Sequence, residues 1–298
     1  MPDTTQVVII TGTSSGFGRL IAETLARKGF QVFATMRNTK AQNVAPAREL
    51  EQLAQRESLN LHVLDLDVTQ DASVEQAVAE VVSKTGRIDV LVNNAGYGIM
   101  DLSETITIEQ AQRQLDVNFF GVVRMNRAVL PTMKSQESGL LLHVSSGGGR
   151  LAIPGMGLYC ASKFAMEALA ETYRYELASQ GIDSVIIEPG PYATPIADKL
   201  ETGEDEQRRA GYGEMGQVPW KILQGILSSR ANPQEIADKV LQIIETPAGQ
   251  RKLRYRVGPG GPGVERINTL TDEIQAQLLE AFGIAEAAKF RTAGGRLT

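Results

Sequence analysis

The sequence predicts an α/β fold in which about seven parallel strands form a single-domain, doubly wound sheet with helices on both faces. Three observations predict it. Short apolar runs alternate with longer amphipathic stretches from the N-terminus onwards, and such alternation is typical of α/β proteins. The runs are apolar almost throughout, as in strands that are buried on both faces. A glycine-rich turn joins the first run to the first amphipathic stretch.

Each expected element follows from its local pattern. Residues 7–10 are too short a run for a helix and are rich in β-branched side chains, whereas 17–28 form an amphipathic stretch that Gly29 ends. Further apolar runs predict strands at residues 31–36, 61–66, 88–92, 140–144, 184–187 and 253–257. Further amphipathic stretches predict helices at residues 47–57, 72–84, 106–133, 158–178 and 232–245.

The chain is expected to form one domain, because no linker rich in proline or serine divides it. Residues 1–258 carry the alternating pattern. Within them, 193–230 form an insertion that begins polar and ends apolar around Trp220. Residues 259–298 are expected to extend the same domain, with one amphipathic stretch at 267–282. The basic run 251–256 alternates along a strand-like segment, which favours exposed edge-strand charge over a polyanion site.

The composition argues against several classes of function. The 298 residues hold 30 Lys and Arg against 35 Asp and Glu, a formal net charge of −5, so we expect no nucleic-acid partner. The single cysteine, Cys160, excludes an internal disulfide, and two histidines argue against a metal centre. No run of about 18 apolar residues is present, and residues 1–6 lack a basic segment. We therefore expect a cytoplasmic protein without a membrane span.

The first strand leads into the segment TGTSSGFG, with Gly12, Gly16 and Gly18. Glycine lets a backbone approach a pyrophosphate closely, and a helix N-terminus offers it free N–H groups. Taken alone, the segment is also compatible with an ordinary tight turn. Its place between a strand and a helix favours phosphate binding.

Tyr159 and Lys163 lie four residues apart, so on a helix they share a face. A lysine there can lower the pKa of the tyrosine from about 10 by stabilising the phenolate. The phenol then comes into the range of a catalytic acid or base. The pair alone is also compatible with a buried tyrosine beside an exposed lysine.

Several segments appear together in order: TGTSSGFG, NNAG at 93–96, Asn118, Ser145-Ser146, YCASK at 159–163 and PG at 189–190. Each follows the carboxyl end of a strand or lies on a helix beside it, where open α/β sheets bind ligands. With this set, about residues 5–258 resemble the compact branch of the short-chain dehydrogenase/reductase family. The resemblance implies a Rossmann-type, dinucleotide-binding and catalytic domain.

The resemblance implies a catalytic tetrad. Tyr159 is implied as the general acid/base, and Lys163 as the residue that lowers its pKa and holds the nicotinamide ribose. Ser146 is implied to hydrogen-bond the substrate oxygen, since its spacing from Tyr159 fits better than that of Ser145. Asn118 is implied to kink its helix and to hold a water that passes protons to Lys163.

The resemblance also implies the cofactor-binding residues. Asp67, beside Val68, resembles the residue that contacts adenine, and the segment with Thr194 resembles the one that holds the carboxamide. The implied set is Gly12, Ser14, Ser15, Gly16, Phe17, Gly18, Arg37, Asp67, Val68, Asn94, Ala95, Gly96, Tyr159, Lys163, Pro189, Gly190 and Thr194.

The expected cofactor is NADP(H) in preference to NAD(H). NAD-dependent enzymes typically carry a carboxylate after the second strand. Met36 stands where the resemblance places that acid, and Arg37 follows it. A guanidinium can pair with the 2′-phosphate through two charge-assisted hydrogen bonds. The alternative is that Arg37 is only a solvated loop charge.

The expected substrate is apolar and medium-sized to large, because the candidate pocket carries few charges. The candidates are Ser146, Tyr159, Tyr97, Leu151, Met156 and Tyr192. The insertion 193–230 is expected to act as a lid. The helix at 158–178 is apolar on more than one face, which together with the resemblance favours a homodimer or homotetramer.

These inferences predict an oxidoreductase that transfers a hydride between nicotinamide and a carbonyl or secondary-alcohol carbon. A catalytically weak, nucleotide-binding regulatory protein on the same fold is the alternative, and the intact tetrad argues against it. The glycine spacing disfavours an epimerase of the extended branch. The sequence names neither the substrate nor the physiological direction.

Overall fold

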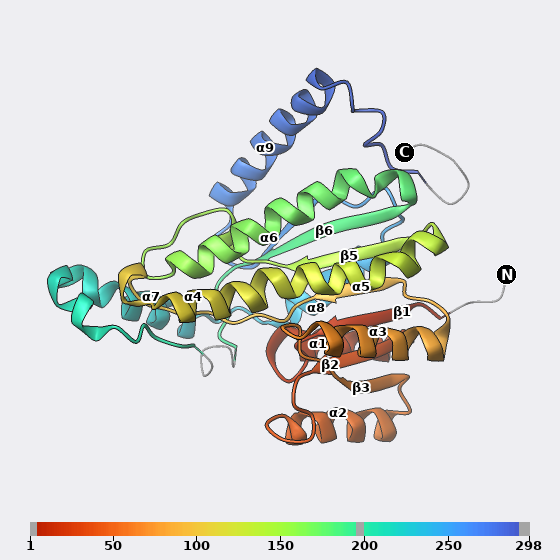
Figure 1. Cartoon of the computed structure of the whole chain (residues 1–298), viewed down its shortest axis with the longest axis horizontal. Coiled ribbons are helices and arrows are strands. Elements are labelled where there is room, and N and C mark those ends of the chain that lie inside the picture. The colour runs from red at the N-terminus through yellow and green to blue at the C-terminus, as the bar shows by residue number, and fades with distance from the viewer. Residues whose placement is uncertain (1–4, 195–199, 292–298) are drawn as a thin grey trace.

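The computed structural model describes residues 5–194 and 200–291 and contains one parallel sheet with the strand order β3-β2-β1-β4-β5-β6-β7 (Figure 1). The strands are β1 (Val7–Thr11), β2 (Gln31–Met36), β3 (Leu61–Asp65), β4 (Val90–Asn93), β5 (Gly139–Val144), β6 (Ile182–Pro189) and β7 (Arg254–Val257). The order reverses between β1 and β4, so the sheet is doubly wound. The predicted fold class is confirmed.

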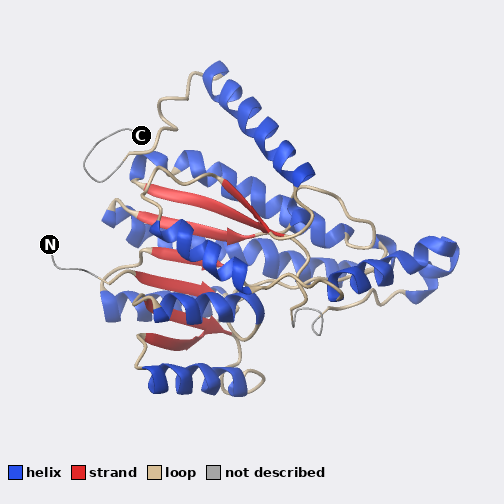
Figure 2. Ribbon diagram, turned by 180° about the vertical axis from the view of Figure 1, so that it is seen from behind, coloured by secondary structure: helices blue, strands red, loops and turns tan. Residues whose placement is uncertain are grey.

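Helices cover both faces of this sheet. They are α1 (Gly16–Arg27), α2 (Val44–Glu57), α3 (Asp71–Thr85), α4 (Ile108–Leu115), α5 (Gly121–Gln136), α6 (Gly157–Glu176), α7 (Val218–Leu227), α8 (Gln234–Glu245) and α9 (Pro262–Ala281). One core cluster packs α1, α2 and α8 against the sheet, as the view from behind shows (Figure 2). The other packs α3 and α5, with the end of α6, against the opposite face.

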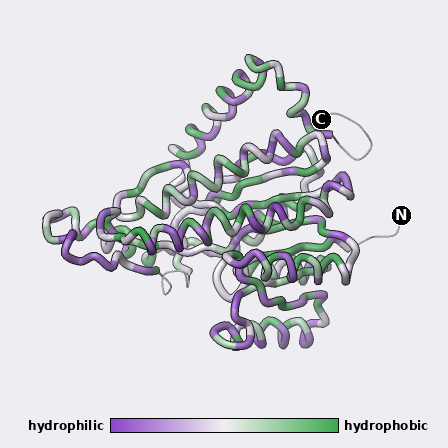
Figure 3. The backbone as a smooth tube through the Cα atoms, viewed as in Figure 1, coloured by the Kyte–Doolittle hydropathy of each residue, from purple (hydrophilic) through white to green (hydrophobic). Residues whose placement is uncertain are grey.

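The strands separate these two cores by simple alternation. Val8 and Ile10 of β1 belong to the α1 side, whereas Val7 and Ile9 belong to the α3 side. All five residues of β1 are buried, and hydrophobic residues dominate the strands in Figure 3. Burial on both faces explains why the runs are apolar throughout and not alternating.

The insertion folds beside the carboxyl edge of the sheet. Its described part contains the 3₁₀ segment η6 (Glu206–Gln217) and α7. An isolated bridge pairs Ile99 with Glu201, and Asp101 accepts a hydrogen bond from Gly203 N at 3.0 Å and pairs with Arg209. Residues 1–4, 195–199 and 292–298 lie outside the described residues, so the expected insertion 193–230 and extension 259–298 are described only in part.

The C-terminal extension forms α9, which projects from the body of the molecule (Figure 1). Leu270, Ile274 and Leu278 on its outer face are exposed. Among the described residues, no helix has the length and apolar character that crossing a membrane requires.

The expectation of exposed basic charge on the last strand is wrong for two residues. The side chain of Arg254 is 2% exposed, and that of Arg251 is 9% exposed. Arg251 pairs with Asp183 at 2.7 Å. Arg254 lies among carboxylates of α6, β6 and α9, because α9 covers what would otherwise be an open edge.

Candidate active site

The glycine-rich turn after β1 forms a tight backbone cradle. Gly12 has a φ of +72°, and a Cβ there would lie 2.8 Å from Ala95 Cα. A Cβ at Gly18 would lie 2.4 Å from Asn94 Nδ2. That amide donates to the carbonyl oxygens of Thr11 at 2.8 Å and of Gly12 at 3.0 Å. The turn is therefore fixed against the NNAG segment at a distance that only glycine permits.

The segment after β6 faces this turn across the edge of the sheet. A Cβ at Gly16, which begins α1 with a φ of +59°, would lie 3.9 Å from Thr194 Cβ. Pro189 ends β6, and Gly190 N donates to the carbonyl of Val257 at 2.8 Å. Ser14, Ser15 and Phe17 lie in the same glycine turn. A bare backbone surface at a helix N-terminus fits a pyrophosphate, so the residues present fit a dinucleotide.

Tyr159 and Ser146 come together at the end of β5. The Ser146 hydroxyl lies near enough to the Tyr159 phenol to lower its pKa, and Ser146 Oγ accepts from Gly148 N at 3.1 Å in the turn η3 (Gly147–Gly149). The tyrosine ring packs between two glycines, since a Cβ at Gly98 or Gly148 would lie 3.5 Å from it. This packing fixes the ring while leaving the phenol beside the serine hydroxyl.

Lys163 lies one helical turn further along α6 and is 5% exposed. Its Nζ donates to the carbonyl of Val144 at 2.9 Å and lies 5.9 Å from the centre of the Tyr159 ring. Burial lowers the pKa of Lys163 to about 8, against an opposing effect of Glu167. The ammonium is therefore held inside the site by a neutral partner.

The expected lowering of the Tyr159 pKa is wrong for this structure. Desolvation raises the pKa of Tyr159 to about 12, and the hydrogen bond with Ser146 opposes this rise only in part. The Lys163 ammonium is directed at a backbone carbonyl and does not offset the desolvation of the phenol.

Asn118 lies in a π-helical turn, η2 (Asp116–Phe120), between α4 and α5. The predicted helix at 106–133 is therefore interrupted. Asn118 Nδ2 donates to the Tyr97 carbonyl at 2.9 Å and to Ser162 Oγ at 3.0 Å, while Oδ1 accepts from Tyr97 N at 3.1 Å. A Cβ at Gly96 would lie 3.1 Å from Asn118 Oδ1 and 3.7 Å from Lys163 Nζ. The structure thus brings these residues together.

The residues implied for the adenosine end lie at the carboxyl ends of β2 and β3. Arg37 is exposed, whereas Met36 before it is buried. Asp67 accepts from Thr69 N at 3.0 Å and from Thr69 Oγ1 at 2.8 Å, which stabilises its own turn. Val68 beside it is buried. Arg37 is thus an exposed cation at this end of the site, and the exposed Asp65 at the end of β3 accepts hydrogen bonds from Thr39.

An apolar cluster adjoins Tyr159 and includes part of the insertion. Its buried members are Met100, Met156 and Cys160, and Ile153, Tyr159, Leu200, Ile222, Leu223 and Ile226 pack against them. Sequence reasoning missed Met100 and Leu200, because nothing local marks a loop residue that turns toward α6. The apolar end of the insertion did mark Ile222, Leu223 and Ile226.

The other expected pocket residues lie in different places. Tyr97 is half-buried and held by Asn118. Leu151 is 44% exposed. Tyr192 is buried in the core on the α1 side, where it contacts Phe17 edge to face and donates its hydroxyl to Glu235 at 2.9 Å. Tyr192 is therefore not part of the apolar cluster beside Tyr159.

Comparison with known proteins agrees with this geometry. Residues 6–205 match the family model for short chain dehydrogenases. The chain belongs to the short-chain dehydrogenase/reductase family. Members are oxidoreductases, so a fold and a site that can hold a dinucleotide are what the family requires.

Two curated relatives cover most of the chain. A 3-ketodihydrosphingosine reductase from Bacteroides thetaiotaomicron is 34% identical over 85% of this chain and 88% of its own length. The 17-beta-hydroxysteroid dehydrogenase type 1 of Mus musculus is 36% identical over 84% of this chain and 72% of its own length.

Two solved structures share the fold. A short-chain dehydrogenase from Streptomyces avermitilis is 30% identical with a TM-score of 0.75, covering 96% of this chain and 99% of that one. An alcohol dehydrogenase from Thermococcus sibiricus, solved with 5-hydroxy-NADP, is 26% identical with a TM-score of 0.67, covering 85% of this chain and 96% of that one.

Proposed function

We propose that this dehydrogenase uses NADP(H) to interconvert a carbonyl and a secondary alcohol on an apolar substrate. One observation carries the proposal: the Ser146 hydroxyl acts directly on the Tyr159 phenol beside an apolar cluster, with a buried ammonium on the same helix. That arrangement presents a proton donor and an oxygen-binding hydroxyl to a carbonyl in an otherwise apolar wall.

The side chains divide the work. When bound, the nicotinamide supplies or accepts the hydride. Tyr159 gives its proton to the substrate oxygen during reduction and takes it back during oxidation. Ser146 holds that oxygen by a hydrogen bond. In the proposal, the ammonium of Lys163, which the structure directs at the Val144 carbonyl, would hold the ribose and stabilise the phenolate once the dinucleotide is bound. Asn118 fixes the Tyr97 backbone beside Gly96.

The cofactor proposal rests on both ends of the dinucleotide site. The glycine cradle and the facing Thr194 would hold the pyrophosphate and the carboxamide. Arg37 offers an exposed guanidinium at the end of β2, where no carboxylate at position 36 competes. A 2′-phosphate fits that charge better than a free hydroxyl does. The related alcohol dehydrogenase solved with 5-hydroxy-NADP supports this choice.

The substrate proposal rests on the apolar cluster. Met100 and Met156 line it from the body of the protein, and Ile222 from the lid. Thioether side chains adapt to bulky apolar shapes. The two curated relatives have names that denote a sphingoid ketone and a steroid, which agrees with a large apolar substrate. The lid orders over that substrate in the proposal.

We also propose a homodimer or homotetramer built on α5 and α6. Phe164 on α6 is 42% exposed and Phe120 before α5 is 48% exposed, and exposed aromatic side chains of this size are typical of subunit contacts. Met166 and Leu177, which the sequence placed on the same apolar helix, are buried within the chain. Light scattering at micromolar concentration measures the assembly, and a monomeric mass would contradict it.

The experiment for the function is Tyr159→Phe, assayed with NADPH against a panel of ketones, aldehydes, steroids and retinoids. We expect kcat to fall about 10²–10⁴-fold, with NADPH binding retained, because a positioned acid contributes that much. Tyr173→Phe on the same helix, outside the site, is the matched control and should change little. Wild-type protein that binds NADPH but turns over none of these compounds would favour the regulatory alternative.

A further inference from the structure

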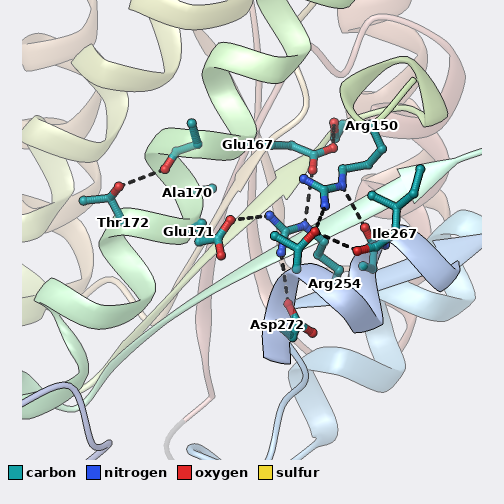
Figure 4. Close-up of polar contacts among 12 residues, drawn as sticks. Arg150, Glu167, Ala170, Glu171, Thr172, Arg254, Ile267 and Asp272 are labelled. Carbon is teal, nitrogen blue, oxygen red and sulfur yellow. Dashed lines mark hydrogen bonds and ion pairs between the residues drawn. The ribbon is translucent and has the colours of Figure 1, made fainter. Parts of the chain in front are cut away.

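A buried carboxylate lies one helical turn beyond Lys163 and touches the loop that carries Ser146. Glu167 is 2% exposed. Its Oε1 accepts a hydrogen bond from Ser145 Oγ at 2.5 Å, and its Oε2 lies 3.3 Å from Arg254 Nε (Figure 4). Ser145 directly precedes Ser146. A single peptide bond therefore separates the serine that Glu167 holds from the one that faces Tyr159.

The turn after Ser145 rests directly on this hydrogen-bonded pair. A Cβ at Gly149 would lie 2.2 Å from Glu167 Oε1 and 2.6 Å from Ser145 Oγ. The backbone thus approaches the two side chains as closely as glycine allows. In the same turn, Ser146 Oγ accepts from Gly148 N. The orientation of Ser146 accordingly depends on a turn that packs against the carboxylate of Glu167.

Arg254 is the cation that faces Glu167 in this buried place. Desolvation raises the pKa of Glu167, and the hydrogen bond from Ser145 and the Arg254 guanidinium oppose that rise only in part. The same guanidinium lies 2.5 Å from Glu171, 3.7 Å from Glu188 and 3.3 Å from Asp272. A buried ion pair of this kind contributes little net stability. Its geometry, in contrast, is fixed by many partners at once.

The C-terminal helix α9 holds the other end of the turn. Arg150, which follows Gly149, donates from Nε to Asn268 Oδ1 at 2.8 Å and from Nη2 to Thr271 Oγ1 at 2.6 Å. Asn268 Nδ2 in turn donates to Glu188 Oε2 at 2.7 Å. Residues 145–150 are therefore held at one end by α6 and at the other end by α9.

We propose that Glu167, paired with Arg254, is a positioning residue that fixes the catalytic orientation of Ser146 through Ser145, and that α9 completes this support through Arg150. The proposal rests on the proposed function, because it takes Ser146 as the residue that binds the substrate oxygen. The competing explanation is that the ion pairs only join β7 and α9 to the body of the protein.

The experiment compares Glu167→Met with Glu171→Met in the full chain. Both remove a carboxylate that faces Arg254 from α6, but among the described contacts only Glu167 touches Ser145 and Gly149. We expect Glu167→Met to lower kcat for the best apolar ketone of the panel about tenfold to a hundredfold, as small misplacements do. The KM for NADPH should stay within about twofold. Glu171→Met should leave kcat within about twofold.

Ser145→Ala provides a milder second variant. We expect it to lower kcat by a similar factor, and we expect the double variant with Glu167→Met to be no worse than the single one, because both break the same connection. Equal kcat losses in Glu167→Met and Glu171→Met, or additive losses in the double variant, would overturn the proposal. Either result would assign the ion pairs a structural role alone.

Hydrogen exchange separates this inference from the proposed function. Exchange of the amides in residues 145–150 should rise at least about tenfold in Glu167→Met but not in Glu171→Met, measured well below the unfolding transition. If the wild type turns over no carbonyl compound, the proposed function fails while this measurement still tests the support of the turn. If the exchange rates are equal in both variants, the positioning role is excluded whatever the activity.

Discussion

Two neighbouring turns of α6 each bury an ionisable side chain, but the partners of these two side chains differ in kind. Lys163 is 5% exposed, and its ammonium donates to a neutral partner, the carbonyl of Val144. Glu167 is buried to the same degree, but its carboxylate accepts from Ser145 and pairs with Arg254, which faces three further carboxylates. One charge is thus desolvated beside a dipole, and the other is desolvated inside an ion network.

The difference shows how one helix serves both chemistry and support. A buried charge without a counter-charge has a strongly shifted pKa, and that of Lys163 is lowered to about 8. Its proton can therefore exchange near neutral pH. A buried charge with several partners is held in a fixed geometry by its hydrogen bonds and ion pairs. Catalysis depends on the first turn, and the loop that carries Ser146 is held by the second.

The largest expected effect comes from removing the first charge. Lys163→Met should lower kcat about 10²–10⁴-fold, because in the proposed mechanism the ammonium stabilises the phenolate once the dinucleotide is bound. The free energy of unfolding at pH 7 should not fall, since an apolar chain of similar length replaces a desolvated charge. Steady-state kinetics with NADPH and urea unfolding measure the two quantities. A loss of stability as large as the loss of activity would remove the contrast between the turns.

Removing Arg254, the guanidinium that pairs with Glu167, should instead lower the free energy of unfolding. Arg254→Met leaves several carboxylates without a counter-charge, and breaking a buried pair costs about 3–5 kcal/mol of stability. Urea unfolding of this variant measures that loss. The loss should shrink as the pH is lowered, because the unpaired carboxylates then take up protons. An Arg254→Met protein as stable at pH 8 as the wild type would show that the ion pairs of Arg254 contribute no net stability.

The same contrast explains what the sequence could predict. Gly12, Tyr159 and Lys163 lie on local turns whose spacing fixes their neighbours, and the structure places them at one edge of the sheet. The strand expected at 31–36 matches β2 residue for residue. Local patterns suffice to place a residue on its own strand, turn or helix, and the parallel sheet then brings the ends of those elements to one edge.

Arg254 could not be placed in that way. Its partners lie on α6, β6 and α9, which are distant in sequence, so a strand of alternating charge looked like an exposed edge. The kink implied at Asn118 is present as the π turn, whereas the partners of its amide, Tyr97 and Ser162, lie on other elements and were not predicted. Tyr192 was assigned to the pocket because the direction of a loop side chain depends on packing that no local pattern records.

The next prediction concerns Arg37, which is exposed, in contrast to the two buried charges of α6. Arg37→Ala should lower kcat/KM for NADPH about tenfold to a hundredfold, because each charge-assisted hydrogen bond contributes roughly 1.5–3 kcal/mol. The efficiency with NADH should change much less. Arg56, also exposed and on α2, is the control for a lost surface charge. Equal losses for NADPH and NADH, or equal efficiencies in the wild type, would contradict the assignment of the 2′-phosphate to Arg37.

The smallest effect concerns a second buried base without a counter-charge. His143 on β5 is fully buried, and its ring nitrogens lie 3.4 Å from Asn93 Nδ2 and 3.3 Å from Ser184 Oγ. Burial, and then the nearby charge of Lys163, lower the pKa of His143 to about 3. The unfolded chain therefore binds more protons than the folded one between about pH 3 and 6.5. Across that window stability rises with pH, is complete above it and is lost as the pH falls.

A single such group changes the free energy of unfolding by at most about 1.4 kcal/mol per pH unit. Urea unfolding of the wild type and of His143→Gln between pH 4 and 7 measures this contribution as a difference in slope. We expect the variant to lose most of one proton's dependence, because glutamine stays neutral throughout. His62, which is half-buried and stacks on Phe33, is the control. Burial lowers its pKa less strongly, so His62→Gln should change the slope less.

Identical slopes for the wild type and His143→Gln would mean that His143 accepts its proton in the folded state. The sheet edge would then tolerate a second positive charge near Lys163, and the account of that lysine as an isolated, desolvated ammonium would fail with it.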